Sequence, residues 1–111
     1  MLEINVEEYK RADLIEVSGR IDSSNASELE GAFKGLADEG RYQLVVEGSG
    51  VEYMSSAGLR ALVAALRESK KHRGDLRIAN PSERMQEVLN LAGLDSVFEI
   101  YEDATSAIGS Y

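Results

Sequence analysis

The spacing of the apolar residues constrains this chain most, because it switches repeatedly between a period of two and a period near 3.6. Leu2, Ile4 and Val6 alternate with polar residues, which predicts a half-buried strand. Elsewhere apolar residues recur three and four positions apart, which predicts helices with one buried face. The helical pattern is clearest at Leu59, Leu62, Val63 and Leu66.

Five strands are expected, at residues 2–6, 14–19, 42–46, 76–79 and 97–101. The first helix opens at residues 22–25 and ends at Gly40, and the second follows residues 51–54 and ends before Gly74. A third runs from residues 80–83 to Gly93, and residues 102–108 form a short terminal helix or a frayed end. Residues 48–50, Gly-Ser-Gly, are expected to form a loop.

The resulting order is β-β-α-β-α-β-α-β-α, and it predicts an α/β fold. The first two strands form an antiparallel hairpin, and strands separated by helices pair in parallel through crossovers. We therefore expect one domain over residues 1–111, with a mixed, mainly parallel sheet of four to five strands packed against helices.

Composition argues against several classes of function. The chain has no cysteine and a single histidine, His72, so a disulfide framework, a thiolate metal site and a multi-histidine metal site are not expected. We also see no nucleophile–base pair and no phosphate loop, and we expect neither an enzyme nor a cofactor. The formal net charge of −8 argues against nucleic acid and anionic membranes as partners. Without a signal peptide or an apolar run of membrane-spanning length, a cytoplasmic location is expected.

The start of the second helix carries the most informative side chains, the adjacent hydroxyls of Ser55 and Ser56. A helix N-terminus has unpaired N–H groups and a partial positive charge, so it can hold a phosphate. Gly58 leaves room for another backbone to approach. Serine is also among the best helix-capping residues, and position alone favours that alternative.

Two further helix starts are predicted from their capping residues. Asn25 and Glu28 have the spacing of a capping box for the first helix. Asn80 is expected to cap the third helix, with Pro81 as its first residue and Glu83 completing the cap.

Residues 45–62 resemble the signature of the STAS-domain anti-sigma-factor antagonists, especially the run Ser-Ser-Ala-Gly-Leu-Arg at 55–60. Residues 19–22 resemble the family's segment after the second strand, and the element order matches over essentially the whole chain. The resemblance implies a partner-switching protein that binds an anti-sigma factor with a GHKL-type serine kinase fold. That kinase phosphorylates the antagonist and so breaks the complex, and a PP2C-type phosphatase restores it.

This chain departs from the family pattern around the glycine. Ser55 stands at the usual aspartate position, and Ala57 replaces the hydroxyl directly before Gly58. By resemblance the phosphorylated residue is Ser56, with Ser55 as the second choice. Glu47 stands where the family usually has aspartate, so its role in supporting the loop is open.

Residues around this helix start are also expected to bind the partner, Asp22 by resemblance and Tyr53 and Met54 because their side chains suit interfaces. Several of these residues have a purely structural alternative. Asp22 could brace the switch loop or be a turn residue, Ser23 and Asn25 could be caps, and Tyr53 and Met54 could belong to the core. The predicted partner-binding residues are Asp22, Ser23, Asn25, Tyr53, Met54, Ser55, Ala57, Gly58 and Arg60.

Two other functions stay open from the sequence. One is a non-switching STAS scaffold or transporter-associated subunit. The other is a small nucleotide- or lipid-binding domain, which would need an apolar pocket or a phosphate cradle.

Overall fold

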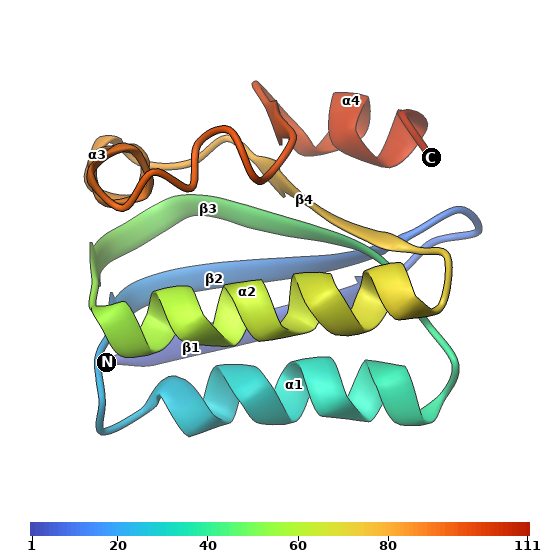
Figure 1. The fold of residues 1–111 in the computed structure, drawn as a ribbon, viewed down its shortest axis with the longest axis horizontal. Helices are drawn as coiled ribbons and strands as arrows, with labels where there is room; N and C mark the ends of the chain where they lie inside the picture. The colour runs from blue at the N-terminus through green and yellow to red at the C-terminus, as the bar shows by residue number, and fades with distance from the viewer.

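The computed structural model describes residues 1–111 and contains a five-stranded sheet with four helices (Figure 1). The strands are β1 (Leu2–Glu8), β2 (Asp13–Ile21), β3 (Gln43–Met54), β4 (Asp75–Ala79) and β5 (Ile100–Tyr101). The helices are α1 (Ala26–Asp38), α2 (Ser56–Lys71), α3 (Glu83–Leu91) and α4 (Ala104–Gly109). This order confirms the predicted fold class.

The strands lie in the sheet in sequence order, β1-β2-β3-β4-β5. β1 pairs antiparallel with β2, and every other pair is parallel. The parallel strands therefore end at the same edge of the sheet, and the start of α2 lies at that edge, directly after β3.

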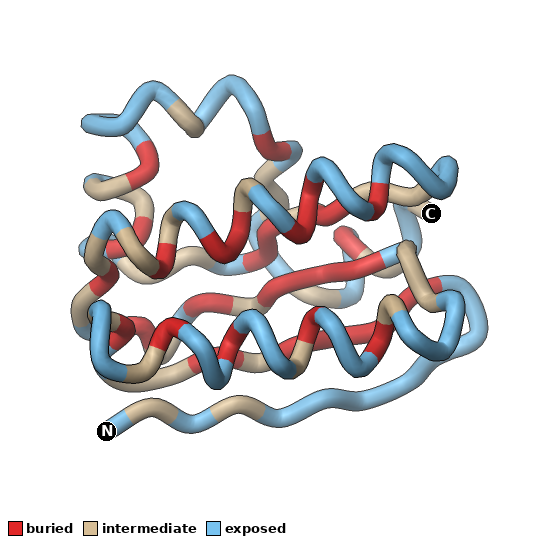
Figure 2. Tube along the Cα trace, turned by 60° about the horizontal axis from the view of Figure 1, so that its bottom comes forward, coloured by how far each residue is buried: buried red, intermediate tan, exposed pale blue.

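The main core lies between the sheet and the pair of helices α1 and α2, which run side by side (Figure 1). Ile15 and Val17 of β2 pack there with Leu29 of α1 and Leu62 of α2, all at most 2% exposed. α3 adds Met85 to the same cluster. Figure 2 shows the buried residues of α1 and α2 turned toward the strands and the exposed ones turned to solvent.

A smaller cluster covers part of the opposite sheet face, where Leu14 and Val45 meet Ala107 of α4. Tyr111 closes this cluster: its hydroxyl lies 2.6 Å from the carbonyl oxygen of Leu44 and 2.9 Å from that of Asp75. The hydroxyl therefore links β3 to the start of β4. Burial raises the pKa of Tyr111 above its ordinary value.

Two predictions about the strands are wrong. Residues 48–50 lie inside β3 instead of forming a loop, because β3 continues to pair with β2 there, with Ser18 opposite Gly50. Glycine is needed at positions 48 and 50 for close contacts. A side chain on Gly48 would collide with Met85, and one on Gly50 with Ser18. The last strand is only Ile100–Tyr101, not residues 97–101.

The residue that turns the chain after α2 is not the predicted glycine. The residue in the left-handed conformation is Arg73, with φ at 65°, and not Gly74. Gly74 is required for another reason, since a Cβ there would collide with the carbonyl oxygen of Tyr42. None of the four helices combines the length and the hydropathy needed to cross a bilayer.

Candidate functional site

The candidate site is the sheet edge where β2 and β3 end and α2 begins. The two strands end in register, with Ile21 opposite Met54. One residue further, the Ser55 amide donates a hydrogen bond of 2.9 Å to the Ile21 carbonyl oxygen. The hydrogen bonding between β2 and β3 thus continues to Ser55, the residue directly before α2. This bond holds the start of the helix next to the loop after β2.

The two serines at this helix start have different surroundings. Ser55 is the N-cap residue, but its hydroxyl makes no capping hydrogen bond. The Ser55 Oγ is buried without any hydrogen-bond partner. Ser56, the first residue of α2, is exposed. Neither hydroxyl caps the helix, so the capping alternative that the sequence left open is not realised.

The loop after β2 is held by its own side chains. Asp22 accepts hydrogen bonds from the amide and the hydroxyl of Ser24, at 2.9 and 2.6 Å. These bonds, the hydroxyl bond first, lower the pKa of the Asp22 carboxyl. The Asn25 side chain accepts from the Asp22 amide at 2.9 Å and donates to the Arg20 carbonyl at 2.8 Å.

The predicted capping box of α1 is therefore wrong. Asn25 occupies the N-cap position, but its side chain does not cap the helix, because it is already bonded within the loop. The expected cap of α3 is also wrong. Ser82, not Asn80, is the N-cap, and its Oγ accepts from the Met85 amide at 3.1 Å. Asn80 instead lies in a left-handed turn, with φ at 47°.

Two predicted partner-binding residues lie inside the protein. Met54 is 3% exposed and belongs to the main core, so its side chain is not a surface contact. Gly58 is buried as well, and a Cβ there would come 2.8 Å from Ile21 Cγ2 and 3.0 Å from Met54 Cγ. The space beside Gly58 is therefore filled by the protein's own side chains and does not receive another backbone.

The other predicted residues surround the helix start at the surface. Ser23 and Arg60 are exposed, and Tyr53 and Ala57 are half-buried. Arg60 lies four residues after Ser56, so the two share one face of α2. We call the surface formed by Ser23, Tyr53, Ser56, Ala57 and Arg60 the switch face.

Arg20 was not singled out from the sequence, yet it borders the switch face. Its guanidinium lies 4.5 Å from the centroid of the Tyr53 ring. The signal that could have found it is the parallel pairing of β2 with β3, which places Arg20 directly opposite Tyr53. The pair adds one cation next to Tyr53 at the border of the switch face.

Glu47 lies in the middle of β3, away from the site, and its carboxylate supports this strand. Its Oε1 accepts from the Ser49 amide and hydroxyl, both at 3.1 Å, and its Oε2 accepts from Asn80 Nδ2 at 3.2 Å. The longer carboxylate thus links the middle of β3 to the end of β4. No group of three or more histidine, aspartate or glutamate side chains is placed to hold a metal ion.

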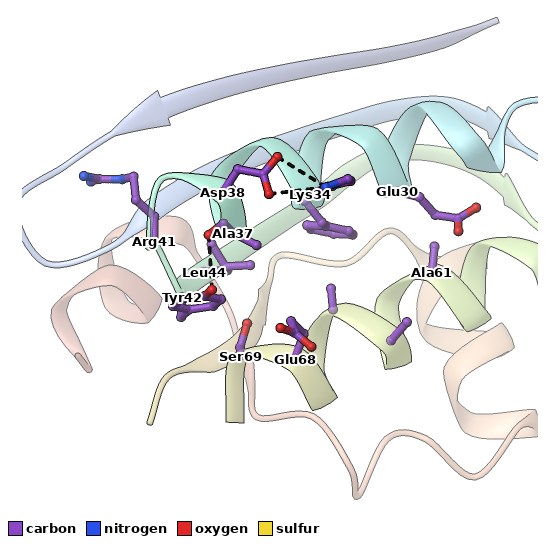
Figure 3. Close-up of a pocket in the computed structure, with 13 residues that line it drawn as sticks. Glu30, Lys34, Ala37, Asp38, Arg41, Tyr42, Leu44, Ala61, Glu68 and Ser69 are labelled. Carbon is purple, nitrogen blue, oxygen red and sulfur yellow. Dashed lines mark hydrogen bonds and ion pairs between the residues drawn. The ribbon is translucent and has the colours of Figure 1, made fainter. Parts of the chain in front are cut away.

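A shallow groove of about 450 Å³ lies between α1 and α2, beyond the switch face (Figure 3). Phe33, Leu44, Ala61 and Ala65 give it apolar walls. The ion pair between Lys34 and Asp38, at 3.3 Å, lies on its rim (Figure 3).

The fold and this site define a small α/β domain that presents one exposed serine, Ser56, and the cation of Arg60 at the start of one helix. The family model of the STAS domain matches residues 3–107, and the chain belongs to the STAS domain family. The resemblance seen in the sequence is thereby confirmed.

Individual relatives agree with this assignment. The anti-sigma-B factor antagonist of Bacillus subtilis is 28% identical over 99 residues, which are 89% of this chain and 90% of that protein. The crystal structure of an anti-sigma factor antagonist from Mycobacterium paratuberculosis superposes with a TM-score of 0.89 at 27% identity, covering 99% of this chain and 93% of that one. The phosphorylated form of the Bacillus cell fate determinant SpoIIAA has the same fold, with a TM-score of 0.78 at 19% identity and coverage of 97% and 98%.

Proposed function

We propose that this protein is an anti-sigma factor antagonist whose unphosphorylated form binds a GHKL-type serine kinase acting as anti-sigma factor. Its relatives carry the name of anti-sigma factor antagonists, and the switch face supplies a surface for such a partner. Around Ser56 the binding surface consists of Ser23, Tyr53, Ala57 and Arg60, with Asp22 and Asn25 shaping the loop beside them.

The difference in exposure between Ser55 and Ser56 supports Ser56 as the phosphorylated residue. A kinase must bring the γ-phosphate of ATP to the acceptor oxygen, and of the two residues Ser56 is the exposed one. The buried Oγ of Ser55 would first have to leave its site. Ser56 is therefore the proposed phosphate acceptor. Ser55 is the less accessible alternative, because its hydroxyl is buried.

The proposed reaction transfers the γ-phosphoryl group of ATP to Ser56 Oγ and releases ADP. The kinase supplies the base that takes the hydroxyl proton. The product gains about 1.5 to 2 negative charges on the switch face. A helix N-terminus accommodates these charges, so the fold persists while a partner fitted to a neutral hydroxyl is repelled. A PP2C-type phosphatase reverses the step by hydrolysis.

Intact-mass analysis with candidate kinases and ATP tests this proposal. The wild-type chain should gain the mass of one phosphate, Ser56→Ala should gain none and keep the kinase bound, and Ser56→Asp should bind more weakly. Ser55→Ala is the matched control, since it removes the neighbouring hydroxyl and should leave phosphorylation intact. Full modification of the Ser56→Ala protein would contradict the assignment.

The groove between α1 and α2 favours a second candidate, binding of a small apolar ligand. It has apolar walls and its volume of about 450 Å³ lies within the range of ligand sites. Thermal-shift titration with decanoate and with ATP tests it. A saturable shift with decanoate that Ala64→Leu removes, by filling the groove, would support it, and no shift with either ligand would reject it.

A further inference from the structure

The end of the molecule opposite the switch face contains a polar cavity of about 300 Å³. Three connections form it: the β1–β2 turn, the loop from α1 to β3 and the loop from α2 to β4. Figure 1 shows these connections gathered at the end of α2, away from its start. The 16 residues of α2 separate the two regions by about 24 Å.

Cationic side chains concentrate around this cavity although the chain as a whole is acidic. The lining residues that can carry positive charge are Lys10, Arg11, Arg41, His72 and Arg73. These are five of only 13 such residues, 12 lysines and arginines and one histidine, in a chain of net charge −8. The lining of the cavity is therefore locally cationic in an acidic chain.

Three of these cations have no carboxylate partner. Lys10, Arg11 and Arg73 form no ion pair, whereas His72 lies 3.7 Å from a Glu68 carboxylate oxygen. Arg11 is held beside the cavity by a hydrogen bond of 3.3 Å from its Nη1 to the Tyr111 carbonyl oxygen. The charges of Lys10 and Arg73 are thus available to a bound anion, and Arg11 keeps further N–H donors beside the one that bonds Tyr111.

Arg41 has a different role, as part of the frame of the cavity. Its Nε donates to the buried carboxylate of Asp13 at 2.7 Å, and its Nη2 donates to the Tyr9 carbonyl at 3.3 Å. The hydrogen bond to Asp13 raises the pKa of Arg41, and the charges of Glu8 and Glu39 act in the same direction. Because these carboxylates compensate Arg41, the three unpaired cations supply the attraction.

The backbone at Arg73 fixes the position of this cation beside the cavity. Its φ of 65° is a left-handed conformation that costs free energy in a residue other than glycine. Glycine or asparagine would normally end a helix in this conformation. Here an arginine occupies the position, and its side chain lines the cavity.

We propose that this cavity binds a small, multiply charged anion bearing phosphate groups. Arginine matches phosphate oxygens with its planar fork of N–H donors, and lysine adds a point charge. The volume of about 300 Å³ fits a small ligand, not a folded partner. The site is separate from the switch face and does not depend on the proposed phosphorylation.

Titration of the full chain with inorganic pyrophosphate at low ionic strength, followed by backbone NMR and calorimetry, tests the proposal. Saturable shifts are expected at Arg11, Arg41 and Arg73, and binding should weaken as salt rises. Arg73→Gly removes one cation but suits the left-handed backbone, so it should fold normally and bind about fivefold more weakly. Arg84→Ala, which removes one cation from α3, is the matched control and should bind like the wild type.

Three results would overturn the proposal. Binding that does not saturate is the first, and equal weakening by Arg73→Gly and Arg84→Ala, which indicates only the loss of net charge, is the second. The third is binding to vesicles containing phosphatidylserine with no response to pyrophosphate, which would indicate a membrane surface. Unchanged phosphorylation of Ser56 in the Arg73→Gly protein would show that the two sites are independent.

Discussion

Gly58 lies so close to Ile21 that a Cβ at position 58 would come within 2.8 Å of Ile21 Cγ2. This contact brings the first turn of α2 onto the end of β2. The glycine of the family motif thus determines how the switch face is seated on the sheet, and its importance can be measured through stability.

Gly58→Ala should destabilise the protein by about 1–2 kcal/mol. The added methyl group overpacks the site against Ile21 and Met54, which outweighs the gain of about 1 kcal/mol in helix propensity. Urea unfolding measures the change. The control is Gly35→Ala in α1, where nothing lies within 4 Å of the new Cβ and a gain of about 0.5–1 kcal/mol is expected. Equal gains for both variants would contradict this account of Gly58.

Two N-cap serines should respond oppositely to alanine. Ser82 Oγ accepts from the Met85 amide and donates to the Val51 carbonyl at 2.6 Å, so Ser82→Ala should cost about 1–2 kcal/mol. Ser55 makes neither kind of bond, and Ser55→Ala removes only an unpaired buried hydroxyl. Its free energy of unfolding should stay the same or rise. A loss in Ser55→Ala as large as that in Ser82→Ala would mean that Ser55 caps α2 in solution.

The stability of the protein should fall at high pH partly through Tyr111. Its pKa is raised in the folded state, so its contribution is complete below the unfolded value of about 10 and is lost as the pH rises above that value. Tyr111→Phe should lack this component and should lose about 1 kcal/mol at neutral pH, because the hydroxyl no longer bonds the carbonyl oxygens of Leu44 and Asp75. Urea unfolding of both proteins between pH 7 and pH 11 measures it. Parallel pH curves for the two proteins would exclude this role.

The Asp22 carboxyl should titrate below the ordinary aspartate value of about 3.9. The ionised carboxyl stabilises the folded state at pH values above the unfolded-state pKa. This contribution disappears as the pH falls through the lower pKa of the folded state. Carbon-detected NMR titration of the side chain measures it directly. Ser24→Ala removes the hydroxyl bond and should move the pKa upward, whereas Ser23→Ala should not. An identical pKa in all three proteins would show that the hydroxyl bond does not form.

The sequence predicted the element order because long segments such as α2 have a regular spacing of apolar residues that is typical of a helix. It failed where contacts between distant residues decide the conformation. Gly48 and Gly50 are typical of loops, yet they lie in β3, where Gly50 pairs with Ser18 of β2. Met85 and Ser18 leave no room for side chains there, so glycine is needed at both positions. Those neighbours cannot be recognised from the local sequence.

The site shows the same division. Residues near the helix start could be named from the motif, and the structure places Ser56 and Arg60 at the surface. The inward position of Met54 and the loop bonds of Asn25 depend on register and on partners across the sheet edge. Arg20 could be found only after the pairing of β2 with β3 was known.

The continuous pairing from Ile21 to Ser55 has a consequence for how such proteins diversify. The buried side chains beside it, Met54 and Ile21, maintain the fold, while Ser23 and Arg60 point away from the core and stabilise little. If the switch face binds the partner as proposed, substitutions at the outward positions can change which partner is recognised without a loss of foldability. Duplicated copies in one genome can drift apart in specificity through a few surface replacements, and signalling routes that share this scaffold can stay insulated from one another.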